Sequence, residues 1–148
     1  GKSGARLMSL RHPENKMSKS SDDINGTIYF NDEKDNILKK FKSSVTDSEN
    51  IVRYDPKNKP GISNLIEIYA AVNDKEISET EKEFENSQYG EFKIAVAETV
   101  IDYLDPIKKN FDDLTSDNLQ DIVVSNLKSA KDSAQKTIIE VEEALGIS

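Results

Sequence analysis

Apolar residues recur at intervals of three and four along most of the chain after residue 30, which is the spacing of an amphipathic helix. The clearest series is the last one, over residues 116–145. Another follows the Pro60-Gly61 pair and runs up to Val72, with the proline at a favoured first helical position. The pattern predicts helices over residues 33–45, 60–72, 78–86, 91–107 and 116–145. Those after Gly61 each have one apolar face to bury, so we expect a mainly α protein built around an antiparallel helical bundle.

Local signals place some of the helix ends and irregularities. Ser78 and Glu81 have the three-residue spacing of a capping box. Pro106 lacks a backbone donor and is expected to kink or restart its helix. The apolar stripe of that helix consists of Phe92, Val96, Val100, Tyr103 and Ile107. The stripe of the last helix consists of Val123, Leu127, Ala130, Ala134, Ile138, Val141 and Leu145, with Gly146 as the left-handed residue after its end.

The first 60 residues show less helical periodicity. Residues 1–26 contain glycines at positions 1, 4 and 26 and many Ser, Asn and Asp residues, which predicts loops with a short strand over residues 5–10. β-branched and aromatic residues at 27–30 predict a second extended piece. Two prolines between residues 50 and 60 predict a further loop. The chain is therefore expected to open with a loop-rich part that precedes the bundle.

Composition narrows the chemistry that the chain can perform. It has no cysteine, which excludes disulfides and thiolate metal sites. His12 is its single histidine, which argues against Ser-His-Asp triads and multi-histidine metal sites. We therefore expect no metal site, and we expect His12 to lie in an exposed loop. No apolar run approaches the length of a membrane span, so no membrane partner is expected.

The net charge of −8 is spread unevenly. Residues 1–60 carry 12 basic and 9 acidic side chains, whereas residues 61–148 carry 8 and 19. An acidic helical part lacks the broad basic surface typical of RNA-binding domains, and only a few local lysines remain for such contacts. For the basic run Lys39-Lys40 and Lys42 a solvated helix face is the favoured interpretation. Contact with a nucleotide or an RNA backbone is the alternative.

The densest cluster of phosphate-binding groups is the run Lys16-Met17-Ser18-Lys19-Ser20. Its two ammonium groups and two hydroxyls suit the triphosphate of a nucleotide, because lysine is a compact cation with three donors and serine adds a hydroxyl in little space. A polar run of this composition is by itself typical of a solvated loop. The exact string, however, resembles the second signature sequence of the class I aminoacyl-tRNA synthetases.

Further segments narrow the resemblance to the bacterial-type tryptophanyl-tRNA synthetases. These segments are Gly4-Ala5-Arg6-Leu7-Met8-Ser9-Leu10, Val45-Thr46-Asp47-Ser48, Arg53-Tyr54-Asp55, Lys59-Pro60-Gly61-Ile62-Ser63-Asn64-Leu65, Tyr89-Gly90 with Phe92-Lys93, and Pro106-Ile107. The related tyrosyl-tRNA synthetases share the loop signature but not the run from Lys59 to Leu65. Lys19 favours a bacterial or organellar origin. Ser21 is a departure, because an acidic residue often follows the signature directly in the family.

The resemblance implies roles for the signature residues. Lys16 and Lys19 are then the catalytic residues, which stabilise the pyrophosphate that leaves ATP. Ser18 and Ser20 contribute hydrogen bonds to the phosphates or to the loop, and the main chain of Met17 meets the adenine. All five residues therefore form the ATP-binding set that the resemblance implies.

The resemblance also implies an organisation. Residues 1–26 correspond to the end of an α/β catalytic domain, residues 27–60 to a connecting strand, helix and loop, and residues 61–148 to a helical region that recognises the anticodon. No residue motif assigns the tRNA contacts. Nothing in the chain resembles the N-terminal nucleotide-binding half of the family with its histidine signature, so the chain resembles the C-terminal part of such an enzyme.

As part of the full-length enzyme, the chain is expected to take part in the ATP- and Mg²⁺-dependent activation of tryptophan and its transfer to tryptophan tRNA. The full-length enzyme is expected to be a homodimer and to be located in the cytoplasm. The isolated chain is expected to be inactive. Two other interpretations remain open at this point. One is a stand-alone helical module that binds tRNA or serves as a structural interaction domain. The other is a fragment of the related tyrosyl-tRNA synthetases.

Overall fold

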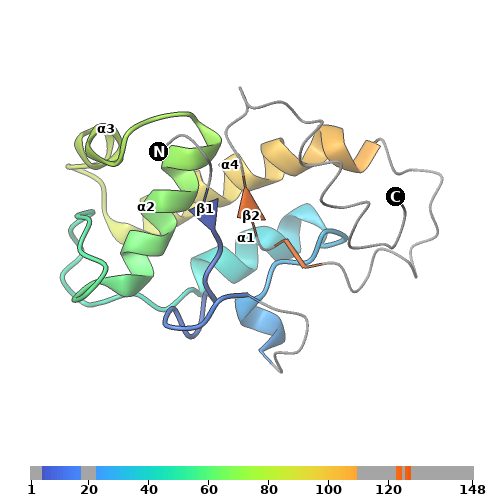
Figure 1. The fold of residues 1–148 in the computed structure, drawn as a ribbon, viewed down its shortest axis with the longest axis horizontal. Helices are drawn as coiled ribbons and strands as arrows, with labels where there is room; N and C mark the ends of the chain where they lie inside the picture. The colour runs from blue at the N-terminus through green and yellow to red at the C-terminus, as the bar shows by residue number, and fades with distance from the viewer. Residues whose placement is uncertain (1–4, 18–22, 110–122, 125, 128–148) are drawn as a thin grey trace.

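The computed structural model describes residues 5–17, 23–109, 123–124 and 126–127 of the chain. The described elements are β1 (Ala5–Arg6), the 3₁₀ helix η1 (Ile24–Gly26), α1 (Lys34–Lys42), α2 (Pro60–Val72), α3 (Ile77–Glu83), α4 (Tyr89–Lys109) and β2 (Asn126–Leu127) (Figure 1). The mainly α prediction is confirmed, because four α-helices account for most of the regular structure and the two strands contain two residues each.

Helix α4 supplies much of the core. It packs against α1 and α2, and one of its faces is completely buried. That face consists of Phe92, Val96, Val100, Leu104 and Ile107. The prediction placed Tyr103 on this stripe, but Tyr103 is only partly buried while Leu104 is 1% exposed. The helix continues through Pro106 to Lys109 instead of restarting there.

Helix α2 lies among the other elements and contacts α3, α4 and both strands. Most of its residues are buried, as expected for a helix that is apolar nearly all round. It begins at Pro60, in agreement with the prediction, and Gly61 allows the turn to approach the loop before it. A Cβ on Gly61 would lie 2.1 Å from the carbonyl oxygen of Val45, so a larger residue does not fit without movement of the backbone.

The predicted capping box of the third helix is wrong. Helix α3 has Glu76 as its N-cap, and Glu76 forms the reciprocal box with Glu79, whose carboxylate accepts from the Glu76 amide at 2.8 Å. Glu81 instead accepts from the Tyr54 amide at 2.7 Å. The sequence offers two acceptor–glutamate pairs with the same spacing, and a contact 27 residues away along the chain engages the second of them.

Helix α1 ends three residues earlier than its periodicity predicts. It stops at Lys42, and Val45 is 44% exposed instead of continuing the apolar stripe. The Ser44 hydroxyl donates to the Phe41 carbonyl at 2.7 Å, and the Val45 amide donates to the Leu10 carbonyl at 2.7 Å. These bonds replace the next helical turn, because the backbone of residue 45 is paired with the N-terminal segment.

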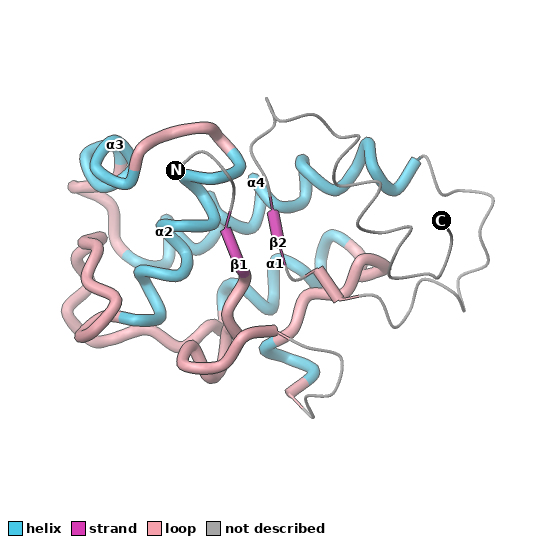
Figure 2. Tube along the Cα trace, viewed as in Figure 1, coloured by secondary structure: helices cyan, strands magenta, loops and turns pink. Residues whose placement is uncertain are grey.

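The predicted last helix is wrong where the structure describes it. Val123 forms an antiparallel bridge with Tyr29, and the Val124 amide donates to the Ile28 carbonyl at 2.8 Å. Strand β2 then pairs antiparallel with β1, beside α2 (Figure 2). Extended partners at 5–6 and 28–29 thus outweigh the helical spacing of this segment. Residues 116–122, 125 and 128–146 of the predicted helix and its cap lie outside the described residues.

Candidate functional site

Only two residues of the predicted ATP-binding set fall within the described part of the chain. Lys16 is exposed and forms an antiparallel bridge with Met8, whereas Met17 is 1% exposed. Ser18, Lys19 and Ser20 lie outside the described residues. Alternate side chains of an extended segment point to opposite faces, so the lysine faces solvent while the methionine is held in the core.

The Lys16 segment is one arm of a small hairpin. The Met17 amide donates to the Leu7 carbonyl at 2.9 Å, and the Ser9 amide donates to the Asn15 carbonyl at 2.7 Å. Residues 15–17 therefore run antiparallel to residues 7–9, and the turn between them carries His12. The His12 side chain is 61% exposed, which confirms the expectation of an exposed loop.

The side chain of Met17 anchors this arm in the core. Its sulfur accepts a hydrogen bond from the Ile28 amide at 3.4 Å. Ile28 is itself fully buried and belongs, with Met17 and Leu7, to the main apolar cluster. The backbone at Lys16 is consequently fixed from both sides, by strand pairing and by the buried neighbour that follows it.

Ser9 holds Asp23, the last residue of the signature segment, by which we mean the signature run and the three residues after it (16–23). Its hydroxyl donates to Oδ2 of Asp23 at 2.8 Å and accepts from the amides of Arg11 and His12 at 3.2 and 3.0 Å. Asp23 also caps η1, since its Oδ1 accepts from the Gly26 amide at 3.2 Å. A Cβ on Gly26 would lie 2.1 Å from Oδ2 of Asp23, so a larger residue there would displace the Asp23 carboxylate from its present position.

Met8, between Leu7 and Ser9, is bound by a side chain from α2. Oδ1 of Asn64 accepts from the Met8 amide and Nδ2 of Asn64 donates to the Met8 carbonyl, both at 3.2 Å. Sequence reasoning missed both Ser9 and Asn64 as supports of the site. The signal for Asn64 was present, because it is an amide within the nearly continuous apolar series of α2.

A second polar cluster lies between the 47–59 loop and α4. Lys59 is 3% exposed, and its ammonium group contacts Oδ1 of Asp47 at 3.1 Å, Oε1 of Glu49 at 3.0 Å and the Tyr89 hydroxyl at 2.9 Å. Burial lowers the pKa of Lys59, but the bonds to Tyr89, Glu49 and Asp47 outweigh it and raise this pKa above its ordinary value. The buried cation is therefore fully paired and is a structural ion centre.

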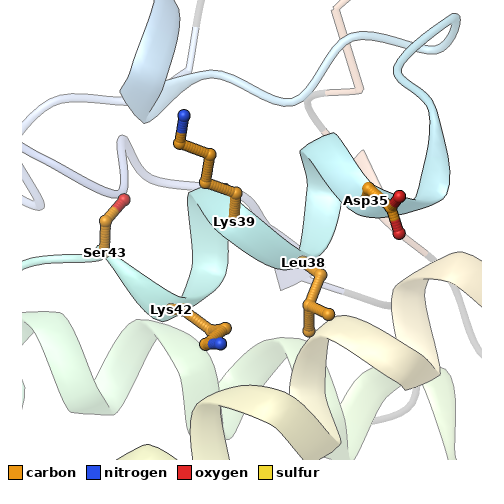
Figure 3. Close-up of a pocket in the computed structure, with 5 residues that line it drawn as sticks. All are labelled: Asp35, Leu38, Lys39, Lys42 and Ser43. Atoms are coloured by element: carbon orange, nitrogen blue, oxygen red, sulfur yellow. The ribbon is translucent and has the colours of Figure 1, made fainter.

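The lysines of α1 separate into two kinds. Lys40 is 3% exposed, and its ammonium group contacts Oδ2 of Asp32 and the Thr27 carbonyl, each at 2.8 Å, so a solvated face is wrong for this residue. Lys39 and Lys42 are exposed and line an open hollow of about 390 Å³. Their ammonium groups point away from each other and do not converge on one point (Figure 3).

Other site chemistries find little support in the described ranges. Within residues 5–17, 23–109, 123–124 and 126–127, no three or more His, Cys, Asp or Glu side chains gather in a way that could hold a metal ion. Of the helices that the structure describes, none combines the length and apolarity required to cross a bilayer. The hairpin that carries Lys16 is the candidate functional site, because it holds an exposed lysine of the signature string on a paired backbone.

Known proteins match the chain over the hairpin and the described helices. The family described as tRNA synthetases class I (W and Y) matches residues 4–105. A tryptophan–tRNA ligase of Oceanobacillus iheyensis is 46% identical over 147 residues, which are 99% of this chain and 45% of that protein. A tryptophan–tRNA ligase of Bacillus subtilis is 42% identical over 147 residues, 99% of this chain and 44% of that protein.

A solved structure agrees. The crystal structure of tryptophanyl-tRNA synthetase from Mycoplasma pneumoniae superposes with a TM-score of 0.66 at 26% identity, covering 95% of this chain and 41% of that one. The chain thus spans less than half the length of each of these relatives.

Proposed function

Because the chain belongs to the class I tRNA synthetases of the W and Y family, we propose that it is the C-terminal part of a tryptophan–tRNA ligase. The relatives described above are tryptophan enzymes, which favours tryptophan over tyrosine as the amino acid. The observation that carries the proposal is the placement of Lys16. An exposed ammonium group stands on a backbone fixed by the Met8 bridge and the buried Met17.

The proposed chemistry is the activation of tryptophan. A carboxylate oxygen of tryptophan bonds to the α-phosphorus of ATP, the bond from that phosphorus to the bridging oxygen breaks, and the electron pair leaves with pyrophosphate. Lys16 and Lys19 stabilise the charge that builds on the leaving group, and cations placed in advance lower such a barrier. Ser18 and Ser20 donate hydrogen bonds to phosphate oxygens. The Mg²⁺ ion arrives with the ATP phosphates as part of the substrate.

The role proposed for Met17 is a main-chain contact with adenine. The thioether side chain is buried and occupied by the Ile28 amide, which leaves the backbone as the part able to meet a nucleotide. The Met17 amide already donates to Leu7, so the proposed contact falls on the carbonyl end of the residue. A carbonyl oxygen can accept from the exocyclic amine of adenine.

The proposed organisation follows the family. Residues 1–26 form the end of the catalytic domain, residues 27–60 connect it to the helical region, and residues 61–148 recognise the anticodon region of tryptophan tRNA. The proposed partners of the whole protein are ATP, tryptophan, tryptophan tRNA and a second copy of itself, in the cytoplasm.

The test is tryptophan-dependent exchange of pyrophosphate into ATP, measured on the full-length protein that contains this chain. The variants are Lys16→Ala, Lys19→Ala and their combination. Removing one group that stabilises transition-state charge typically costs about 10²–10³ in rate, so each single variant is expected to lose at least about 100-fold in kcat. Lys57→Ala, at an exposed position of the 47–59 loop, is the matched control and should keep its rate. Rates equal to wild type in the Lys16 and Lys19 variants would refute the proposal.

The isolated 148-residue chain is expected to show no exchange. It contains one wall of the proposed nucleotide site, and the resemblance places the amino-acid pocket elsewhere in the enzyme. The same assay on the chain alone checks this expectation, and tryptophan-dependent turnover there would contradict it.

A further inference from the structure

The contact between Asn64 and Met8 joins two parts of the chain that are 56 residues apart. The Asn64 side chain is 3% exposed and lies on α2 among apolar neighbours. It satisfies both the donor and the acceptor of the Met8 backbone, each at 3.2 Å. An amide side chain has one acceptor oxygen and one donor nitrogen, so it replaces the edge of a neighbouring strand for this one residue.

Met8 is the middle one of three residues, 7–9, that bind the signature segment. It is the bridge partner of Lys16. The residue before it, Leu7, accepts the Met17 amide, and the residue after it, Ser9, binds Asp23. Residues 17 and 23 flank the remaining signature positions, so three consecutive residues fasten both ends of that segment. Asn64 in turn fastens the middle one of the three to α2.

We propose that Asn64 is a positioning residue for Lys16. It fixes the base of the signature segment to α2, and thereby sets where the Lys16 ammonium group stands relative to the helical part of the protein. This inference rests on the proposed function, because it assigns a role to Asn64 in the same activation step.

Geometry explains why an amide is used at this position. An apolar side chain would fill the same space among the neighbours of α2, but it would leave the Met8 amide and carbonyl without these partners. Apolar packing is non-directional, whereas two hydrogen bonds to the backbone of one residue fix both its position and its orientation. A displacement of about 1 Å at a reacting group can cost about 10²-fold in rate, so a weak tether can have a large effect on activity.

The experiment compares Asn64→Leu with Ser63→Ala in the full-length protein. Leucine has the same branched arrangement of heavy atoms, with methyl groups in place of the oxygen and nitrogen, and it removes both bonds to Met8. Ser63 is 1% exposed on the same helix, and its hydroxyl accepts from the Asp55 amide at 2.8 Å, away from the signature segment. We expect Asn64→Leu to lower kcat of pyrophosphate exchange about 10–100-fold, with KM for tryptophan within twofold of wild type. Ser63→Ala should lower the melting temperature but keep kcat within twofold.

A double-mutant cycle separates positioning from general destabilisation. If Asn64 acts through Lys16, then Asn64→Leu should cause little further loss in a Lys16→Ala background, so the two effects are not additive. Additive losses, or a kcat of the folded Asn64→Leu protein within twofold of wild type, would overturn the inference. Asn64→Asp is the second variant should the leucine protein fail to fold. It keeps the acceptor for the Met8 amide but places a carboxylate against the Met8 carbonyl, and it must show the same loss of kcat.

The outcomes also distinguish the inference from the proposed function. No exchange in the wild-type protein, or full activity in Lys16→Ala, would remove the proposed function and this inference with it. An active wild type that loses activity in Lys16→Ala but keeps it in both Asn64 variants would remove the inference alone.

Discussion

Different forces hold the hairpin over residues 7–17, with its tie to Asp23, and the packed faces of α2 and α4. In the hairpin the decisive contacts are directional: Ser9 to Asp23, Met17 to Leu7, and Asn64 to both polar atoms of the Met8 backbone. In the helical part they are apolar. The rings of Phe84 and Phe92 lie 4.7 Å apart, and the Tyr69 ring meets that of Phe84 edge-on at 5.0 Å.

This difference assigns different tasks to the two regions. Burial of apolar area is the dominant favourable term in folding, so the helical part determines whether the chain folds. A hydrogen bond contributes only about 0.5–1.5 kcal/mol net, so the polar contacts of the hairpin contribute less to stability than the apolar core does. Its bonds instead fix the direction of one exposed lysine. Variants in the helical part should therefore change stability most, and variants in the hairpin should change activity most.

The largest expected loss of stability comes from Phe92→Ala. Phe92 is 0% exposed and contacts both Tyr69 and Phe84, so the variant leaves a cavity at the centre of the helical part. The expected cost is about 3–5 kcal/mol of unfolding free energy, measured by chemical denaturation. Ile94→Ala, on the exposed side of the same helix, is the control and should cost far less. Similar losses in both variants would contradict an apolar core at this position.

The next largest effect is expected from Gly61→Ala. The new Cβ would lie 2.1 Å from the Val45 carbonyl oxygen, a backbone atom that cannot move by rotation of a side chain. The cost should be near the upper end of the ~1–3 kcal/mol typical of overpacking. Gly90→Ala is the matched control. Nothing lies within 4 Å of its Cβ, so the reduced freedom of the unfolded chain should stabilise the protein by about 0.4–1 kcal/mol.

The helical part was largely predictable from the sequence, and the exceptions have physical causes. The start of α2 at Pro60 and the buried stripe of α4 follow from periodicity and a residue with fixed backbone geometry. The end of α1 and the capping residue of α3 depend on Leu10 and Tyr54, which are distant in the chain. Val123 has helical spacing relative to its neighbours, but a partner at Tyr29 makes it extended.

The sequence pointed to the candidate site through Lys16, but not to the residues that hold the backbone of Lys16 in place. Lys16 stands out because a literal string of five residues surrounds it. Ser9 and Asn64 lie in two other segments that carry the resemblance, but those segments do not show what the two side chains contact. Their contacts appear only when the fold brings them to Asp23 and Met8. Lys40 shows the converse, since a lysine in a basic run became a buried partner of Asp32. Local sequence identifies chemistry, but it does not show which polar residues meet.

A moderate effect with a distinctive pH dependence is expected for Asp47→Asn. Burial raises the pKa of Asp47, but hydrogen bonds from the Glu49 amide, Tyr89 and Lys59 outweigh it and hold this pKa below its ordinary value of 3.8. A carboxyl group whose pKa is lowered on folding stabilises the protein above its unfolded pKa, and this contribution is lost as the pH falls through the folded value. The variant should therefore be less stable at pH 7, by about 1.5 kcal/mol.

The measurement is the unfolding free energy of both proteins from pH 7 down to pH 3. The difference between wild type and Asp47→Asn should stay constant down to about pH 4 and should narrow below it, because protonation removes the same interaction from the wild type. Asp102→Asn, at an exposed position of α4, controls for the loss of one charge. A difference that does not narrow in acid would show that Asp47 acts through packing instead of charge.

The smallest expected change in stability is the one that tests the comparison most directly. Ser9→Ala removes the tie to the Asp23 carboxylate and two bonds accepted from amides of an exposed turn, where water can replace the hydroxyl, so its cost should be about 1–1.5 kcal/mol. Ser44→Ala, whose hydroxyl donates to the Phe41 carbonyl at the end of α1, should cost about the same. Denaturation of the two variants should therefore give nearly equal results.

Activity should separate these two serine variants. In the full-length protein we expect Ser9→Ala to lower kcat of pyrophosphate exchange about tenfold, which corresponds to about 1.4 kcal/mol of lost transition-state stabilisation. Ser44→Ala should leave kcat within twofold, since it holds a helix end and not the signature segment. Equal rates in the two variants would mean that the hairpin supports the fold in the same way as the helices do, and the division of tasks between the two regions would fail.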